Sequence, residues 1–85
     1  MTLEVFSVYD RVAKNFLDPF FAPNAAFAMR TFSNCCKDKS HPFGKNPEDF
    51  ALFKIGEFGQ ENGVVSPCEP DRIFTGTEAA AVASE

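Results

Sequence analysis

The chain has 85 residues, enough for one small domain and too few for a second. Its 45% hydrophobic and 24% charged residues are ordinary for a folded protein and exclude a wholly disordered chain. The formal net charge is -4, and all of it lies in residues 61–85, because basic and acidic residues balance before that point. This charge argues against nucleic-acid binding through overall attraction and leaves a local basic patch as the only electrostatic route.

Segments for membrane crossing, secretion or cofactor binding are not evident in the sequence. No apolar run reaches the roughly 18 residues of a membrane helix, and the N-terminus lacks a basic and apolar leader. Cys35 and Cys36 are adjacent and Cys68 is distant, so a disulfide is not expected. With His41 they lack zinc-ligand spacing. We expect a soluble cytosolic protein with reduced thiols and neither metal nor cofactor.

The first half of the chain predicts a strand and then a helix. Residues 3–9 are rich in β-branched and aromatic residues, with apolar positions on both faces, as in a central strand. Pro19 interrupts residues 10–22, which we expect to form a loop with its phenylalanines tucked against the core. Residues 23–37 predict the main helix, with Pro23 at its first position.

The predicted helix has two distinct faces. Its apolar stripe, expected to be core, comprises Ala25, Ala28, Met29, Phe32, Cys35 and Cys36. The opposite side carries Phe27, Arg30, Asn34 and Lys37. One aromatic ring therefore lies beside two cations on the face that should be exposed to solvent.

The second half of the chain predicts a hairpin. Residues 38–47 form a polar loop, and residues 48–58 form a strand with a bulge at Gly56. Asn62-Gly63 is a strong turn signal, followed by a return strand at residues 64–66. Pro67 and Pro70 are expected to end that strand, before a short edge strand at residues 72–74.

These elements predict an α+β fold, a three- or four-stranded antiparallel sheet with one main helix packed on one face. Residues 1–74 form the single domain, and residues 75–85 form an alanine-rich acidic tail that is either a short helix or disordered. Thr75 to Glu78 is a capping-box pattern ahead of that alanine run. Because the sequence has eleven phenylalanines and a core too small to bury them all, we expect a homodimer.

Catalytic chemistry is not indicated. The sequence has no Walker loop, GxGxxG or GxSxG motif, and Glu48 and Asp49 are typical of solvated loop residues. We therefore expect a protein that is not an enzyme. Single-stranded nucleic acid is held by cations along its phosphates and by aromatic rings that stack on its bases. The candidate residues for such binding are Phe27, Arg30, Asn34, Lys37, Lys39, Lys45, Arg11, Lys14 and Lys54.

Three stretches resemble a known family. VFSVYD (residues 5–10), FLDPFFAPNAAFAMRTF (16–32) and NPEDFALFKIGEF (46–58) are similar to the small non-structural protein of the gokushoviruses, single-stranded DNA phages of the microvirus family. The most specific piece runs from Pro47 to Phe58. The resemblance covers about residues 5–66 and stops before Pro67.

The resemblance implies a non-structural bacteriophage protein that acts in the host bacterial cytoplasm. It implies DNA binding during viral DNA replication and genome packaging, and it supplies no catalytic residues. We therefore predict binding of single-stranded DNA without strong sequence preference. The alternative is a non-enzymatic adaptor that docks on a capsid precursor or a replication initiator through its aromatic surface. The acidic pI of about 4.9 favours this alternative.

Overall fold

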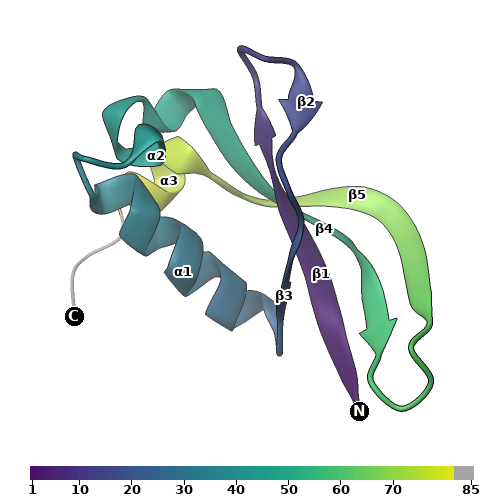
Figure 1. Ribbon diagram of the computed structural model, residues 1–85. Helices are drawn as coiled ribbons and strands as arrows, with labels where there is room; N and C mark the ends of the chain where they lie inside the picture. The colour runs from purple at the N-terminus through teal and green to yellow at the C-terminus, as the bar shows by residue number, and fades with distance from the viewer. Residues whose placement is uncertain (82–85) are drawn as a thin grey trace.

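The sheet is organised around its first strand, which has neighbours on both edges. In the computed structural model, which describes residues 1–81, β1 (Thr2–Asp10) pairs along its whole length with β4 (Phe50–Gly59). Its other edge is shared by the short β2 (Asn15–Phe16) and β3 (Phe20–Ala22). The last strand, β5 (Val65–Thr75), pairs with β4. All pairings are antiparallel. Together the strands form one five-stranded sheet (Figure 1).

The helices cover one side of this sheet (Figure 1). The longest is α1 (Ala25–Lys37), followed by the single-turn α2 (Pro42–Lys45) and the 3-10 helix η1 (Pro47–Asp49). The last, α3 (Gly76–Ala80), follows β5 directly and packs against α1. No helix within residues 1–81 has the length and apolar character needed to span a membrane.

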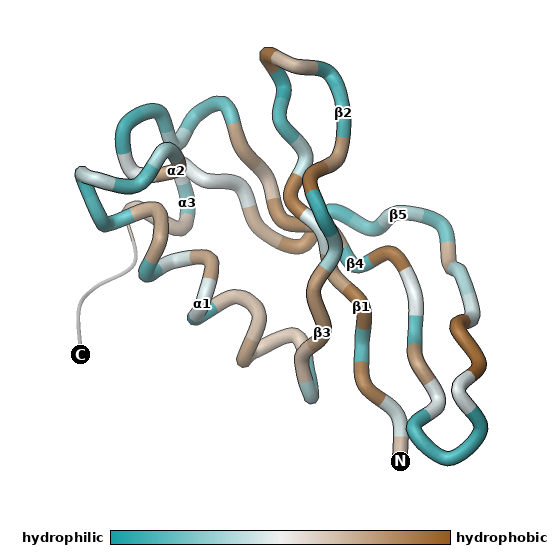
Figure 2. Tube along the Cα trace, in the orientation of Figure 1, coloured by the Kyte–Doolittle hydropathy of each residue, from teal (hydrophilic) through white to brown (hydrophobic). Residues whose placement is uncertain are grey.

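The main core lies between the sheet and α1. Alternate residues of β1 and β4 point to the helix side, because successive side chains of a strand point to opposite faces. Figure 2 shows hydrophobic positions where these strands run side by side and hydrophilic residues around the β4–β5 turn. The fully packed core consists of Phe6, Val8, Ala22, Ala28, Phe32, Cys36, Leu52 and Ala79.

The structure confirms the α+β class and the main helix on one face of an antiparallel sheet, with five strands where three or four were predicted. The difference lies in residues 10–22, which were predicted to be a loop. Phe20–Ala22 pair with the free edge of β1, and a tight turn with Lys14 at φ 62 brings Asn15–Phe16 back beside Asp10. Edge pairing satisfies backbone groups of β1 that would otherwise be exposed.

Two predicted boundaries were wrong. The main helix begins at Ala25 and not at Pro23, because the Asn24 side chain caps it by accepting a hydrogen bond from the Phe27 backbone N–H. The return strand does not end at Pro67. β5 continues through both prolines to Thr75, which an edge strand allows because its outer N–H groups need no partner.

The C-terminal segment begins as an ordered part of the fold. Thr75 and Glu78 form the predicted capping box at the start of α3, and Ala79 is fully buried against α1. Gly76 is also buried, and a Cβ atom at this position would collide with the Pro47 carbonyl group. The predicted boundary after residue 74 thus falls one residue before the end of β5. Residues 82–85 of the predicted tail lie outside the described part of the chain.

We predict that Phe32→Ala destabilises the fold by about 3–5 kcal/mol, because the ring is 2% exposed and its removal leaves a cavity. The matched control is Phe27→Ala on the same helix, where the ring is 52% exposed and the expected change is within about 0.5 kcal/mol. Urea unfolding followed by circular dichroism measures both. Equal unfolding midpoints for Phe32→Ala and the wild type would show that the helix faces are assigned wrongly.

Candidate nucleic-acid interface

The side of the sheet that faces away from α1 is lined by a continuous set of apolar and aromatic side chains. Directly paired residues of neighbouring strands share a face, so the register identifies them. In β1 they are Leu3, Val5, Ser7 and Tyr9. Their partners on the other strands are Phe16, Phe21, Ala51, Phe53, Gly56, Phe58, Val65, Pro67, Arg72 and Thr75. We call this set the open face, because the helices of the described chain lie on the other side (Figure 1).

Three aromatic rings meet at one end of the open face. The ring centroids of Tyr9 and Phe16 are 5.0 Å apart, and those of Phe16 and Phe53 are 5.3 Å apart. Both pairs pack edge to face, the arrangement that the aromatic quadrupole favours. Phe16 remains 42% exposed. This end therefore presents a rigid aromatic surface to solvent.

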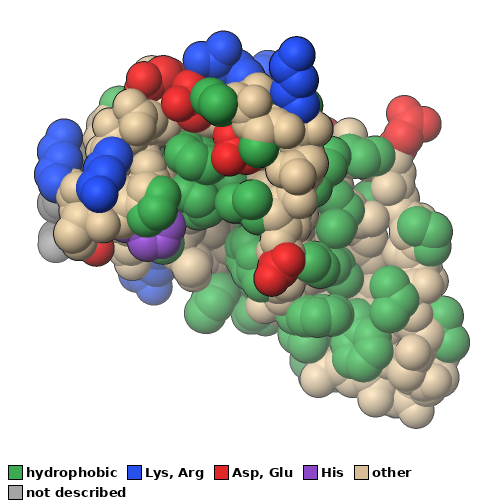
Figure 3. Space-filling model, turned by 45° about the horizontal axis from the view of Figure 1, so that its top comes forward, with side chains coloured by type: hydrophobic (Ala, Val, Ile, Leu, Met, Phe, Trp, Pro, Cys, Tyr) green, Lys and Arg blue, Asp and Glu red, His purple; other side chains and the backbone are tan. Residues whose placement is uncertain are grey.

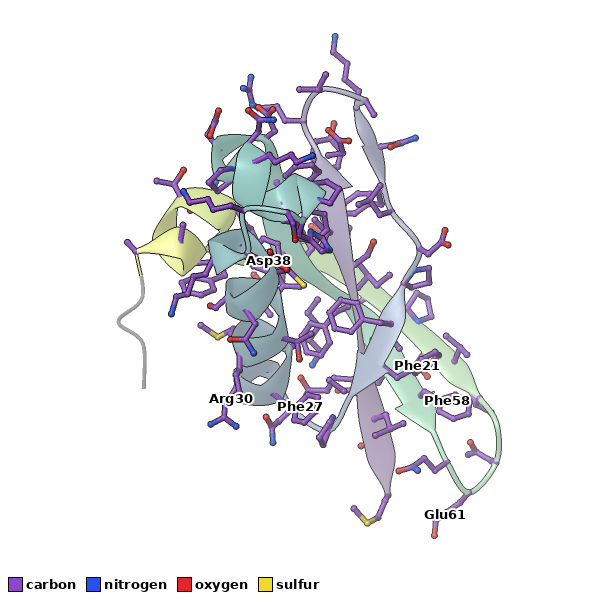
Figure 4. All side chains as sticks on the ribbon, turned by 60° about the vertical axis from the view of Figure 1, so that its left-hand side comes forward. Phe21, Phe27, Arg30, Asp38, Phe58 and Glu61 are labelled. Carbon is purple, nitrogen blue, oxygen red and sulfur yellow. The ribbon has the colours of Figure 1, made fainter. Side chains whose placement is uncertain are left out.

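A second aromatic pair lies toward the β4–β5 turn. Phe21 of β3 and Phe58 of β4 contact each other across β1, with ring centroids 5.3 Å apart. Both project on the side of the sheet away from α1 (Figure 4). Phe21 is 49% exposed and Phe58 is half-buried. The open face thus carries aromatic rings along much of its length.

The rings of the open face cover the middle of β1. Val5 and Ser7 are both buried, although the helices of residues 1–81 lie on the other side. The Ser7 hydroxyl donates a 2.6 Å hydrogen bond to the Leu17 carbonyl oxygen, so its burial leaves no polar group unsatisfied. This second apolar layer is one side chain deep. The side of this layer that faces solvent is formed by the aromatic rings of the open face.

The charges of the strands are sorted between the two faces. By register, Glu4, Lys54, Glu57 and Asp71 lie on the helix side, and the Lys54 ammonium group is 3.7 Å from Glu4 and 3.4 Å from Glu57. Desolvation opposes protonation of Lys54, but these two carboxylates raise its pKa. None of the paired strand residues on the open face is acidic, and one of them, Arg72, is basic. The paired positions of the strands therefore place no carboxylate among the aromatic rings.

A hollow of about 230 Å³ lies beside the Tyr9 ring, at the end of the open face nearest η1. Its walls include Tyr9, Phe53 and Arg72, and its rim carries Arg11 and Asp49. The Arg11 guanidinium donates a 2.8 Å hydrogen bond to the Asp49 carboxylate, and this ion pair joins the end of β1 to η1. We call this feature the Tyr9 hollow. It brings aromatic, cationic and anionic groups within reach of one small ligand.

The DNA-binding residues that were predicted on the main helix lie in the helical layer, away from the open face. Phe27, Arg30, Asn34 and Lys37 follow one stripe of α1, where the first three are exposed and Lys37 is partly buried. Figure 4 shows Phe27 and Arg30 near the N-terminal end of α1, with Arg30 pointing away from the sheet. This surface keeps the predicted aromatic and basic character. It is separated from the open face by the whole thickness of the core.

The remaining predicted cations are distributed over several places. Lys39 and Lys45 are exposed in and beside α2, and Lys14 is exposed in the β1–β2 turn. Arg11 and Lys54 are held in separate ion pairs, Arg11 with Asp49 of η1 and Lys54 with Glu4 of β1. In Figure 3 the Lys and Arg side chains gather toward one end of the molecule, and hydrophobic side chains extend toward the other. The nine predicted residues do not form one continuous site.

The open face itself was not predicted from the sequence. Leu3 to Tyr9 were recognised as a strand with apolar residues on both faces, and Phe53 was placed on a strand. Phe16 and Phe21 were assigned to a loop, because Pro19 lies between them. Edge pairing with β1 places both on the open face. For Phe21, the available signal is its place next to Phe20, because neighbouring residues of a strand point to opposite sides of the sheet.

The cysteines form no cluster in the structure. Cys36 is buried, Cys35 is partly buried and Cys68 is exposed, and all three are free thiols. Within residues 1–81, no three side chains of His, Cys, Asp or Glu are grouped in an arrangement that would hold a metal ion. Burial, with a smaller contribution from Cys35, raises the pKa of Cys36 to about 11.

The fold is that of a small two-layer protein, with helices on one side of the sheet and partly exposed aromatic side chains on the other. The family model described as "Phage ORF5 protein" matches residues 3–79. This chain therefore belongs to the Phage ORF5 protein family and is a bacteriophage protein. No curated protein and no solved structure matches it.

We predict that stability falls between about pH 9 and the folded pKa of Cys36, about 11. The unfolded thiol ionises near its ordinary pKa of about 8.5, so the unfolded chain loses this proton first and is favoured as pH rises. Urea midpoints at about pH 8 and about pH 10 measure the effect. Cys36→Ala should reduce this fall, whereas Cys68→Ala, at an exposed position, should not. An unchanged fall in Cys36→Ala would contradict the assignment.

Proposed function

We propose that this phage protein binds single-stranded DNA across the open face. The observation that carries the proposal is a solvent-accessible aromatic surface on a sheet whose paired positions on that face include no carboxylate. Base stacking on aromatic side chains is worth about 1–3 kcal/mol per base and tolerates any sequence. Phe16 and Phe21 are the most exposed rings of this surface and are the main stacking positions.

A single strand suits this surface better than a duplex. The rings lie on a sheet and not on a projecting element, so they reach only bases that are already unstacked and turned outward. Five aromatic side chains lie along the face, from Tyr9 and Phe16 at one end to Phe21 and Phe58 toward the other. A strand that lies along the sheet would present several bases in succession.

Electrostatics makes a small contribution to this binding. Arg72 is the cation on the paired positions of the open face, and Arg11 at the rim is already paired with Asp49. Each phosphate contact contributes a slope of about -0.7 to the dependence of log affinity on log salt for single strands. We therefore expect a shallow salt dependence, with stacking as the main source of affinity.

The finer role rests on the sequence resemblance to the gokushovirus non-structural protein. We propose that the protein acts in the host bacterial cytoplasm, where single-stranded viral DNA is made and packaged. Binding without strong sequence preference suits that task, because a genome being packaged presents every sequence in turn. The family assignment supports the general part of this proposal, that the protein belongs to a bacteriophage.

Protein docking through the same face is the second candidate. The observation that favours it is the edge-to-face packing of Tyr9, Phe16 and Phe53, which leaves fewer flat ring surfaces for bases. The partner would be a capsid precursor, a replication initiator or a second copy of the chain. The predicted homodimer remains a prediction. Sedimentation that shows a dimer, together with no binding to oligonucleotides, would favour this candidate.

We predict that single-stranded oligothymidylate quenches the tyrosine fluorescence of the protein. Tyr9 is the only tyrosine and there is no tryptophan, so the intrinsic emission reports on the open face alone. A stacked base near Tyr9 would quench it, whereas DNA bound on the outer surface of α1 would not. The titration is corrected for base absorbance with N-acetyltyrosinamide. Binding without quenching would place the DNA elsewhere.

We predict that Phe21→Ala weakens binding to oligothymidylate by about 1–3 kcal/mol, because one stacking position is lost. Phe27→Ala is the matched control, since both rings are about half exposed and lie on different layers. Fluorescence polarisation with a labelled oligonucleotide measures both affinities. A loss only in Phe27→Ala would move the site to the α1 surface that the sequence predicted.

Arginine variants separate phosphate contacts from stacking. We predict that Arg72→Gln makes the salt slope shallower by about 0.7, whereas Arg30→Gln, with the same change in charge on the α1 surface, leaves it unchanged. Affinities are measured over a range of salt concentrations. If wild-type protein binds no single-stranded oligonucleotide at any salt concentration, the DNA-binding proposal fails.

A further inference from the structure

The Tyr9 hollow differs from the rest of the open face because it combines rings with hydrogen-bonding groups of both charges. Its volume of about 230 Å³ is below the roughly 300–1,000 Å³ of typical small-molecule sites, so it suits one ring system and not a longer ligand. We propose that the hollow accepts one guanine base of the bound strand. This inference rests on the proposed DNA-binding function and adds a base preference to it.

The hollow exists because two small side chains lie beside a large one in the same row of the sheet. Tyr9, Ala51 and Thr75 form one row across three strands, and Phe53 and Arg72 lie in the next row. Ala51 and Thr75 are too small to fill the space beside the tyrosine ring, so the surface is lowered there. A planar base entering this space would contact the rings of Tyr9 and Phe53.

The polar groups of the hollow favour a base over a phosphate group. Arg11 and Arg72 attract anions, but Glu48 and Asp49 also line the hollow and balance their formal charges. A phosphate would therefore meet two carboxylates together with two guanidinium groups. An uncharged base with both donors and acceptors on its edges meets no such repulsion.

Guanine fits this donor and acceptor set best. Its Watson–Crick edge carries two adjacent donors, N1–H and the N2 amino group, and a carboxylate accepts from both. Asp49 accepts from Arg11 through Oδ1, and no described residue donates to its Oδ2. Guanine also presents the acceptors O6 and N7, which arginine recognises. Arg72 makes no ion pair with residues 1–81. It is therefore available to a phosphate group when the hollow holds no guanine, and it can supply those donors when guanine enters.

The other bases match the hollow less well. Thymine has a single ring N–H between two carbonyl groups, which would face the Asp49 carboxylate unfavourably. Adenine and cytosine each offer one amino group on that edge, without an adjacent N–H donor. A well-formed two-bond pair discriminates between bases by about 5- to 100-fold in affinity. The preference is thus expected to be moderate and superimposed on sequence-tolerant stacking.

The test compares oligothymidylates that differ at one central base. Wild-type protein should bind the oligonucleotide with guanine about 5- to 100-fold more tightly than the all-thymine one, and inosine, which lacks the N2 amino group, should lose most of this gain. Asp49→Asn should abolish the preference for guanine over inosine. The preference is measured as a ratio of affinities within each protein, so a change in the affinity of the variant for all-thymine DNA does not affect the comparison.

Asp71→Asn is the control, since it removes a carboxylate of β5 that lies on the helix side of the sheet. It should keep the guanine preference, and thermal melting checks that both variants are folded. Equal affinities of wild-type protein for guanine and inosine oligonucleotides, with all-thymine binding intact, would overturn the guanine site and leave DNA binding standing. Failure to bind any of the oligonucleotides would overturn both.

Discussion

The pairing of β1 on both edges is the constraint on which the rest of the structure depends. A strand in the middle of a sheet alternates its side chains between two faces, so its apolar residues must be covered twice. Phe6 and Val8 are covered by α1 and its neighbours, and Val5 and Ser7 by aromatic rings of the strands themselves. One strand therefore generates both the core and the open face.

This division explains the many phenylalanines of a short chain. Six of the eleven belong to the helix side: Phe6, Phe20, Phe32, Phe43, Phe50 and Phe74. Four lie on the open face, and Phe27 lies on the outside of α1. A domain of this size buries a smaller fraction of its surface than a larger one. The rings on the open face thus cover β1 and also remain partly exposed to solvent.

The sorting of charge between the faces keeps the paired strand carboxylates away from the aromatic side chains. Net charge acts over distances of about 8–10 Å at moderate salt, so the local arrangement of charges decides the potential at each face. The ion pairs of Lys54 with Glu4 and Glu57 hold strand carboxylates on the helix side. On the open face, Arg72 and the rings remain. The proposed binding of single-stranded DNA, in which stacking outweighs charge, depends on that arrangement.

Local signals in the sequence were sufficient to predict several elements: the strand near residues 3–9, the helix ending at Lys37, a bulge next to Gly56, the turn at Asn62-Gly63 and the capping box after Thr75. Local propensity, caps and turn residues act over a few positions, so a short stretch of sequence contains their whole signal. The gathering of Phe16 and Phe21 with Tyr9 and Phe53 on one face depends on the tertiary fold. Strand partners on the far edge of β1 are chosen by long-range pairing, which no local pattern around Pro19 contains.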